Sequence, residues 1–128
     1  MKKREKFSHG EIHWSEYCSD DAKATLDFCQ DLFGWQVMFE PSDNQYFLKH
    51  GDNPMVSIFQ RDENVKKDGL PPHVSNYVAV KDYESTLSKA VDQGAEIIME
   101  NEHPSGNHKL AVLKIPGNLI LQIVEYFK

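Results

Sequence analysis

The sequence predicts an α+β fold in which two tandem βαβββ modules form a curved mixed sheet around a cleft. Two observations lead to this prediction. The order strand, helix and three strands occurs twice along the 128 residues. Each expected helix also runs into a glycine, Gly34 or Gly94, and a strand follows at once. A composition that is 40% hydrophobic and 27% charged fits one compact domain or two small packed halves.

The first module is expected over residues 10–60, after a flexible N-terminal segment of residues 1–9. It opens with a strand and continues with a helix, for which Ser19 or Asp20 is the expected N-cap by residue type. The inner stripe of this helix is Ala22, Leu26, Cys29 and Phe33. Gly34 then lets the chain reverse onto the sheet. The three following strands are expected at 35–40, 44–50 and 54–60.

The second module is expected over residues 73–126, and the charged, proline-closed stretch 61–72 reads as a linker. Asp82 is expected to cap a helix that ends at Gly94. Its inner stripe is Tyr83, Leu87 and either Ala90 or Val91. The strands of this module are expected at 73–80, 95–100, 108–115 and 118–126.

The two modules align as copies of one unit. When the two modules are aligned in sequence, Asp21 lies opposite the capping Asp82. Gly34 follows Asp21 by 13 positions, and Gly94 follows Asp82 by 12. An acidic residue also closes the next strand in both copies, as Glu40 and Glu100. The sequence therefore predicts an internal duplication.

Charge and composition exclude several classes of protein. The net charge of −6 and the pI near 5.4 disfavour nucleic acid as a partner, because phosphate binding requires clustered Lys and Arg. No apolar run reaches the length of a signal-peptide core or of a membrane span, so we expect a cytoplasmic protein without a membrane partner. Cys18 and Cys29 are expected to be free thiols, and Cys29 to be inert in the helix core.

The chain resembles the vicinal oxygen chelate superfamily, which includes glyoxalase I, bleomycin and fosfomycin resistance proteins and extradiol dioxygenases. The resemblance covers residues 10–126 and lies in "FGW" after the first helix, "YVAVKD" before the second and "KIPGN" before the last strand. With Trp14 and Glu16 on the first strand, the chain is most similar to small bacterial glyoxalase-like members. The resemblance implies a homodimer and a small-molecule ligand.

The resemblance also indicates where a metal ion would bind. Metal-dependent members place one His, Glu or Gln on the first and fourth strands of each module. Counting back from Asp21 and Asp82 gives Trp14 and Ser75 at the first-strand positions, or His13 and Val74 after a slip of one residue.

Aligning Asn53 with Asn118 pairs Ser57 with Gln122 at the fourth-strand positions. This register places only apolar side chains toward the helices, namely Val56, Ile58, Leu119, Leu121 and Ile123. The resulting set of Trp14, Ser57, Ser75 and Gln122 is poor in donors, so no cofactor is expected. The alternative is a divalent metal held by His13, His73 and Gln122, joined by Glu16 if the first strand carries a bulge.

Several residues are candidates for contact with an organic ligand. The full set is Trp14, Glu16, Phe47, Met55, Ser57, Phe59, His73, Ser75, Tyr77 and Gln122. Glu16 is the one catalytic candidate, as a base or hydrogen-bond acceptor beside the indole of Trp14, unless it is a solvated rim carboxylate. Tyr77 either orients a ligand or ends a hydrophobic layer, and the phenylalanines and Met55 suit a ligand-pocket wall and a plain core equally.

Three functions remain open at this point. The first is a metal-free protein that binds or sequesters a planar or aromatic compound. The second is a divalent-metal-dependent lyase, isomerase or dioxygenase, and the third is a partner-binding module with an exposed apolar patch. We rank them in that order, and fold alone cannot decide between them.

Overall fold

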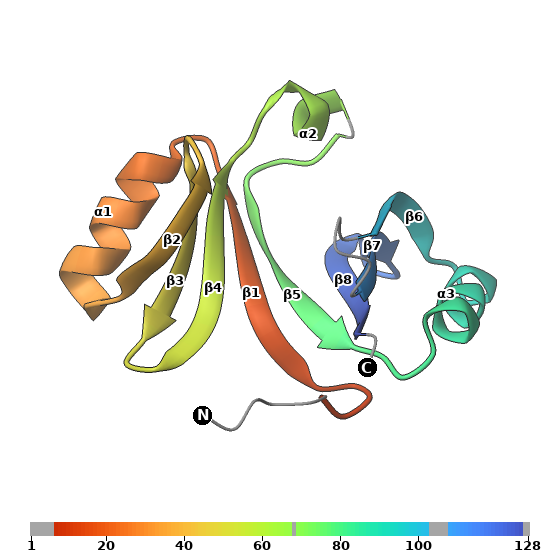
Figure 1. The fold of residues 1–128 in the computed structure, drawn as a ribbon. Helices are drawn as coiled ribbons and strands as arrows, with labels where there is room; N and C mark the ends of the chain where they lie inside the picture. Colours follow the sequence, from red (N-terminus) through yellow and green to blue (C-terminus); the bar gives the residue numbers. More distant parts are fainter. Residues whose placement is uncertain (1–6, 68, 103–107, 127–128) are drawn as a thin grey trace. The chain divides into compact units, whose positions relative to one another are not determined.

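The computed structural model describes residues 7–67, 69–102 and 108–126 (Figure 1). The chain forms two compact units. We call Trp14–Ser75 the N-terminal unit, and Met1–His13 together with Asn76–Lys128 the C-terminal unit. The α+β class and the twice-repeated βαβββ order are confirmed.

The N-terminal unit is a four-stranded sheet with one helix on it. Its elements are β1 (Ile12–Ser19), α1 (Ala22–Phe33), β2 (Gln36–Ser42), β3 (Gln45–His50) and β4 (Asn53–Gln60). The strand order is β2-β3-β4-β1, with β1 parallel to β4 and the other neighbours antiparallel. In Figure 1, α1 lies along the side of β2, β3 and β4.

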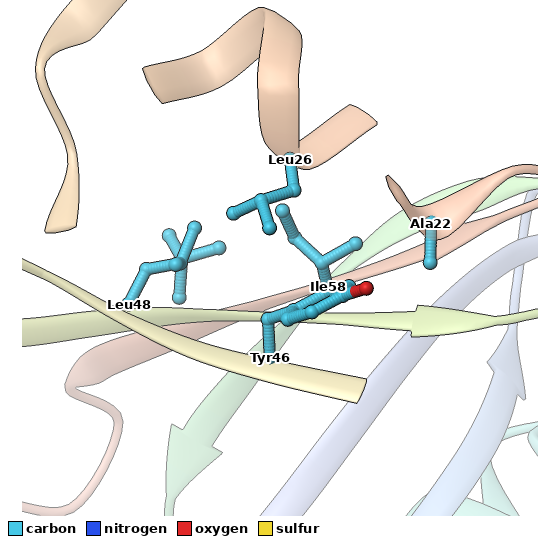
Figure 2. Packing of buried hydrophobic residues seen from close by; sticks show 6 residues of the cluster. Ala22, Leu26, Tyr46, Leu48 and Ile58 are labelled. Carbon is cyan, nitrogen blue, oxygen red and sulfur yellow. The ribbon is translucent and has the colours of Figure 1, made fainter. Parts of the chain in front are cut away.

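Apolar side chains from α1 and the sheet form the core of this unit. Leu26 points from the helix toward Tyr46, Leu48 and Ile58 (Figure 2), and Ala22 and Val56 complete the buried cluster. Burial of each large side chain stabilises the fold by about 1.5–3 kcal/mol. The expected register is confirmed here, since Val56 and Ile58 both belong to this cluster.

One residue of the predicted helix stripe lies outside the core. Phe33 is 51% exposed, although Ala22, Leu26 and Cys29 are buried as expected. Phe33 is the last residue of α1, and its ring packs against Trp35 at 5.1 Å between centroids instead of reaching the sheet.

The C-terminal unit repeats this topology. Its elements are β5 (His73–Ala79), α3 (Tyr83–Asp92), β6 (Glu96–Glu102), β7 (His108–Ile115) and β8 (Leu119–Tyr126), with strand order β5-β8-β7-β6 and β5 parallel to β8. Its core is Val80, Tyr83, Leu87, Ala111, Leu113 and Ile123. One expectation was wrong in detail, since Leu119, at the very start of β8, is 63% exposed. Of the two alternatives left open for the helix stripe, Ala90 packs on the core and Val91 is exposed.

The N-terminal ends of the two helices follow the duplicated pattern, whereas the C-cap is Gly34 in α1 and Gln93 in α3. Asp21 and Asp82 are the N-caps, and each carboxylate accepts a backbone N–H three residues later. The cap of α1 is thus neither Ser19 nor Asp20; the Ser19 hydroxyl instead accepts the Asp21 backbone N–H. Gly34 has φ 70°, the left-handed conformation that favours glycine, as predicted.

The two segments expected outside the modules also contain local structure. Residues 61–72, read as a linker, contain the short helix α2 (Glu63–Lys67). Arg61 fixes the start of this segment through Asp20 at 2.7 Å and the Leu70 carbonyl at 3.3 Å. Of the N-terminal segment, residues 1–6 lie outside the described residues, whereas His9 accepts the Lys81 backbone N–H through Nδ1.

Candidate functional site

Four side chains of the N-terminal unit form a row across its sheet, on the face opposite α1. Strand pairing places Phe39 of β2 beside Phe47 of β3, Phe47 beside Ser57 of β4, and Ser57 beside Glu16 of β1. Trp14 precedes Glu16 by two residues on β1, so alternation places it on the same face. We call these five residues the Trp14 face.

A buried hydroxyl connects the polar groups of this face. Ser57 is only 2% exposed. Its Oγ accepts a hydrogen bond from Trp14 Nε1 at 3.1 Å and donates a long one to Glu16 Oε2 at 3.5 Å. The chain of contacts fixes the edge of the indole ring and directs the carboxylate to the same side of the sheet.

Three aromatic rings lie along this face. Phe39 and Phe47 are stacked, with centroids 4.6 Å apart and planes 23° from parallel. The Trp14 ring lies 5.8 Å from Phe47 and is tilted by 48°. Phe39 is 50% exposed, so the platform is open to solvent at this end. Such an arrangement can hold a flat apolar molecule by stacking.

Sequence reasoning identified Trp14, Glu16, Phe47 and Ser57 but missed Phe39. The register between β2 and β3 shifts on both sides of Phe39, so simple alternation along the strand does not assign its face. Counting from the turn does not find it either, because the Ser42–Gln45 pair would place Phe39 opposite Leu48 instead of Phe47.

The C-terminal unit carries the corresponding row with different chemistry. Tyr77 of β5 pairs with Gln122 of β8, Gln122 with Val112 of β7, and Val112 with Met99 of β6. Gln122 thus occupies in this unit the position that Ser57 occupies in the other, as the alignment predicted. His13 lies edge-on to Tyr77 at 6.2 Å between ring centroids.

The remaining candidates occupy varied environments. Met55 packs against the core cluster beneath α1, at a register shift between β3 and β4. Phe59 is half-buried beside Cys18, and Ser75 is 2% exposed. The Nδ1 atom of His73 donates a hydrogen bond to the Pro71 carbonyl oxygen at 2.6 Å, so this ring nitrogen is engaged by the local backbone.

The donor chemistry of the four predicted metal-ligand positions does not fit a divalent ion. The indole N–H of Trp14 is a donor only, Ser57 and Ser75 offer neutral hydroxyls, and Gln122 offers one carboxamide oxygen. Within residues 7–67, 69–102 and 108–126, no three His, Cys, Asp or Glu side chains are grouped as a metal site requires.

Three buried titratable groups have raised pKa values. Burial and the nearby Glu16 carboxylate raise the pKa of the Cys18 thiol to about 11, and burial raises the pKa of Cys29 as well. In the C-terminal unit, burial raises the pKa of Tyr83, and so does the 2.6 Å hydrogen bond from its hydroxyl to Glu100. These groups stay protonated near neutral pH and therefore do not supply a nucleophile.

Comparison with protein families gives one match over most of the chain. The sequence model of the Glyoxalase/Bleomycin resistance protein/Dioxygenase superfamily matches residues 11–120. The chain is 26% identical over 102 residues to the Mycobacterium tuberculosis protein named "Putative glyoxylase CFP32", covering 77% of this chain and 39% of that protein. It is 25% identical over 125 residues to the anthracycline biosynthesis protein DnrV of Streptomyces peucetius, covering 88% and 46%. The chain therefore spans less than half the length of these curated relatives.

Several solved structures share the fold of this chain. A superfamily member from Vibrio splendidus gives a TM-score of 0.67 at 15% identity, covering 88% of this chain and 96% of that one. A Mn(II)-bound glyoxalase from Novosphingobium aromaticivorans gives a TM-score of 0.63 at 16% identity, covering 92% of this chain and 38% of that one.

No helix in the described part of this chain is long and apolar enough to cross a membrane.

Proposed function

Because the chain belongs to the glyoxalase/bleomycin resistance protein/dioxygenase superfamily, we propose that it binds a planar aromatic small molecule on the Trp14 face, without a metal ion. The observation that carries this proposal is the contact of three aromatic rings beside a buried hydroxyl and a carboxylate. Ligand sites typically combine apolar aromatic surface with a few convergent polar groups of this kind. One relative is named for the biosynthesis of anthracyclines, which contain planar fused rings, and this supports the proposal.

The proposal is tested by removing the exposed ring of the platform. Phe39→Ala should weaken binding of acridine, a planar tricyclic probe, by about two- to twelvefold, because an aromatic pair contributes about 0.5–1.5 kcal/mol beyond its buried area. The matched control is Phe33→Ala, which is equally exposed and also contacts another aromatic ring, but lies on α1. Isothermal titration calorimetry measures both. Absence of acridine binding, or equal loss in both variants, would overturn the proposal.

The second candidate is a divalent-metal-dependent lyase, isomerase or dioxygenase, which the Mn(II)-bound neighbour favours. It would use His13, His73 and Gln122, two imidazoles and one carboxamide. Metal analysis of protein purified without chelator decides between the candidates. A stoichiometric ion that is lost in His13→Ala would replace the metal-free proposal with this one.

We also propose that the protein is a cytoplasmic homodimer. The two free, buried cysteines suit a reducing compartment. Large apolar side chains are exposed in both units, among them Ile12, Val74 and Leu119, and exposed apolar side chains are typical of surfaces that a second copy covers. Light scattering coupled to size exclusion should give twice the chain mass of 14.7 kDa, and a monomer at micromolar concentration would refute the dimer.

A further inference from the structure

We propose that the Trp14 face selects planar molecules carrying a positive charge at one edge, such as protonated heteroaromatic amines, with Glu16 as their counter-ion. This inference rests on the proposed function and deepens it by assigning a charge to the ligand. It follows from the order of the side chains along the row, from the chemistry of the aromatic faces and from the position of the carboxylate.

The order of the row separates a charged end from an apolar end. Glu16 lies on β1, Ser57 on the adjacent β4, and Phe47 on β3 beyond it. Neighbouring strands are about 4.8 Å apart, so Glu16 and Phe47 start from backbone positions roughly 10 Å apart. Two or three fused six-membered rings span a comparable length. A molecule of this size that stacks at the phenylalanine end brings its other edge to the carboxylate.

The faces of the aromatic rings and the Glu16 carboxylate both attract a positively charged ligand. The face of an aromatic ring carries the negative end of its quadrupole, and an indole attracts cations most strongly. Trp14 stands two residues from Glu16 on the same strand and face, so its ring and the carboxylate act on one region. An anionic ligand would instead meet both a like charge and the repulsive ring faces.

The buried hydroxyl of Ser57 supports the position of this charge. Ser57 donates to Glu16 Oε2 while it accepts from the indole, so its hydroxyl proton is already directed to the carboxylate. A carboxylate has about four lone-pair sites and can accept a further donor from a ligand. A charged N–H donor makes the stronger hydrogen bond with it.

The test compares two probes of nearly identical shape. At mildly alkaline pH, 9-aminoacridine is a cation and acridine is uncharged. Wild-type protein should bind the cation at least about fivefold more tightly, since hydrogen bonds to charged groups exceed neutral ones by about 1 kcal/mol or more. Glu16→Gln should abolish this preference, because it should weaken binding of 9-aminoacridine much more than binding of acridine.

Glu40→Gln is the matched control, because it removes the same charge from the residue next to Phe39. The Glu40 charge acts on Lys23 of α1, which places it toward the helix side of the sheet. This control should keep the preference for the cation. If Glu16→Gln folds poorly, wild-type protein alone is sufficient: added salt should weaken binding of 9-aminoacridine but not of acridine.

The possible failures can be told apart. If both probes bind equally and neither Glu16→Gln nor salt alters their ratio, the charge selectivity is refuted while the proposed function stands. If neither probe binds, the proposed function is refuted and the selectivity with it.

Discussion

Replacing Ser57 by alanine tests whether the buried hydroxyl organises the Trp14 face. The change removes one oxygen from a side chain that is 2% exposed and adds no bulk. The hydrogen bond from Trp14 Nε1 is 3.1 Å long and partly buried, so its loss should cost about 1 kcal/mol. The 3.5 Å bond to Glu16 contributes less. Because the indole N–H is left without its acceptor, we expect a total destabilisation of about 1–2 kcal/mol.

Urea unfolding followed by far-UV circular dichroism measures this loss. Ser42→Ala is the control, because its hydroxyl also donates to a side chain, Gln45 Oε1 at 2.9 Å, but on the exposed surface. The control should stay within about 0.5 kcal/mol of wild type. Equal stability of the two variants would show that Ser57 does not hold the indole, and the argument for a preorganised face would fail.

Three further predictions concern the backbone and the buried titratable groups. Gly34→Ala should destabilise the protein by about 1–2 kcal/mol, as measured by urea unfolding, because φ is 70° at this position. The space for a methyl group is open, so the cost is conformational and not steric. An unchanged unfolding midpoint would contradict this prediction. Tyr83→Phe should cost about 1.5–3 kcal/mol below pH 10, because the hydrogen bond to Glu100 is lost. Since the raised folded-state pKa of Tyr83 makes wild-type stability fall as pH rises above its ordinary 10.0, the variant should show a shallower loss there, and identical slopes would refute this. Ellman's reagent should label neither Cys18 nor Cys29 in native protein near neutral pH and both after denaturation, and rapid native labelling would exclude the buried, protonated state.

The strand and helix order was predictable because the duplication supplies two readings of one pattern. Asp82 and Gly34 act as predicted, and alignment of Ser57 with Gln122 gave the register that strand pairing confirms. The helix caps depend on the residue type at single positions, so they can be predicted from the sequence. The cap of α1 was ambiguous because three candidate residues are adjacent, and only backbone geometry selects Asp21.

The side-chain environments were less accessible to prediction. Met55 and Phe39 both lie at register shifts, where an extra residue changes which face a side chain occupies. Phe33 satisfies the helical period but ends its helix, so it stacks on Trp35 instead of entering the core. Periodicity reports the face of an element and not how far the covering sheet extends.

The C-terminal unit is made of two separate segments of the chain, which affects the order of folding. The Ala79 backbone bonds to Gly10 and Glu11, and Lys81 to His9, so this unit needs residues from the start of the chain. The N-terminal unit is one continuous segment that can assemble during synthesis while the later half is still being made. Closure of the C-terminal unit joins distant parts of the chain, so we expect it to be the slower event because of its loop-closure entropy.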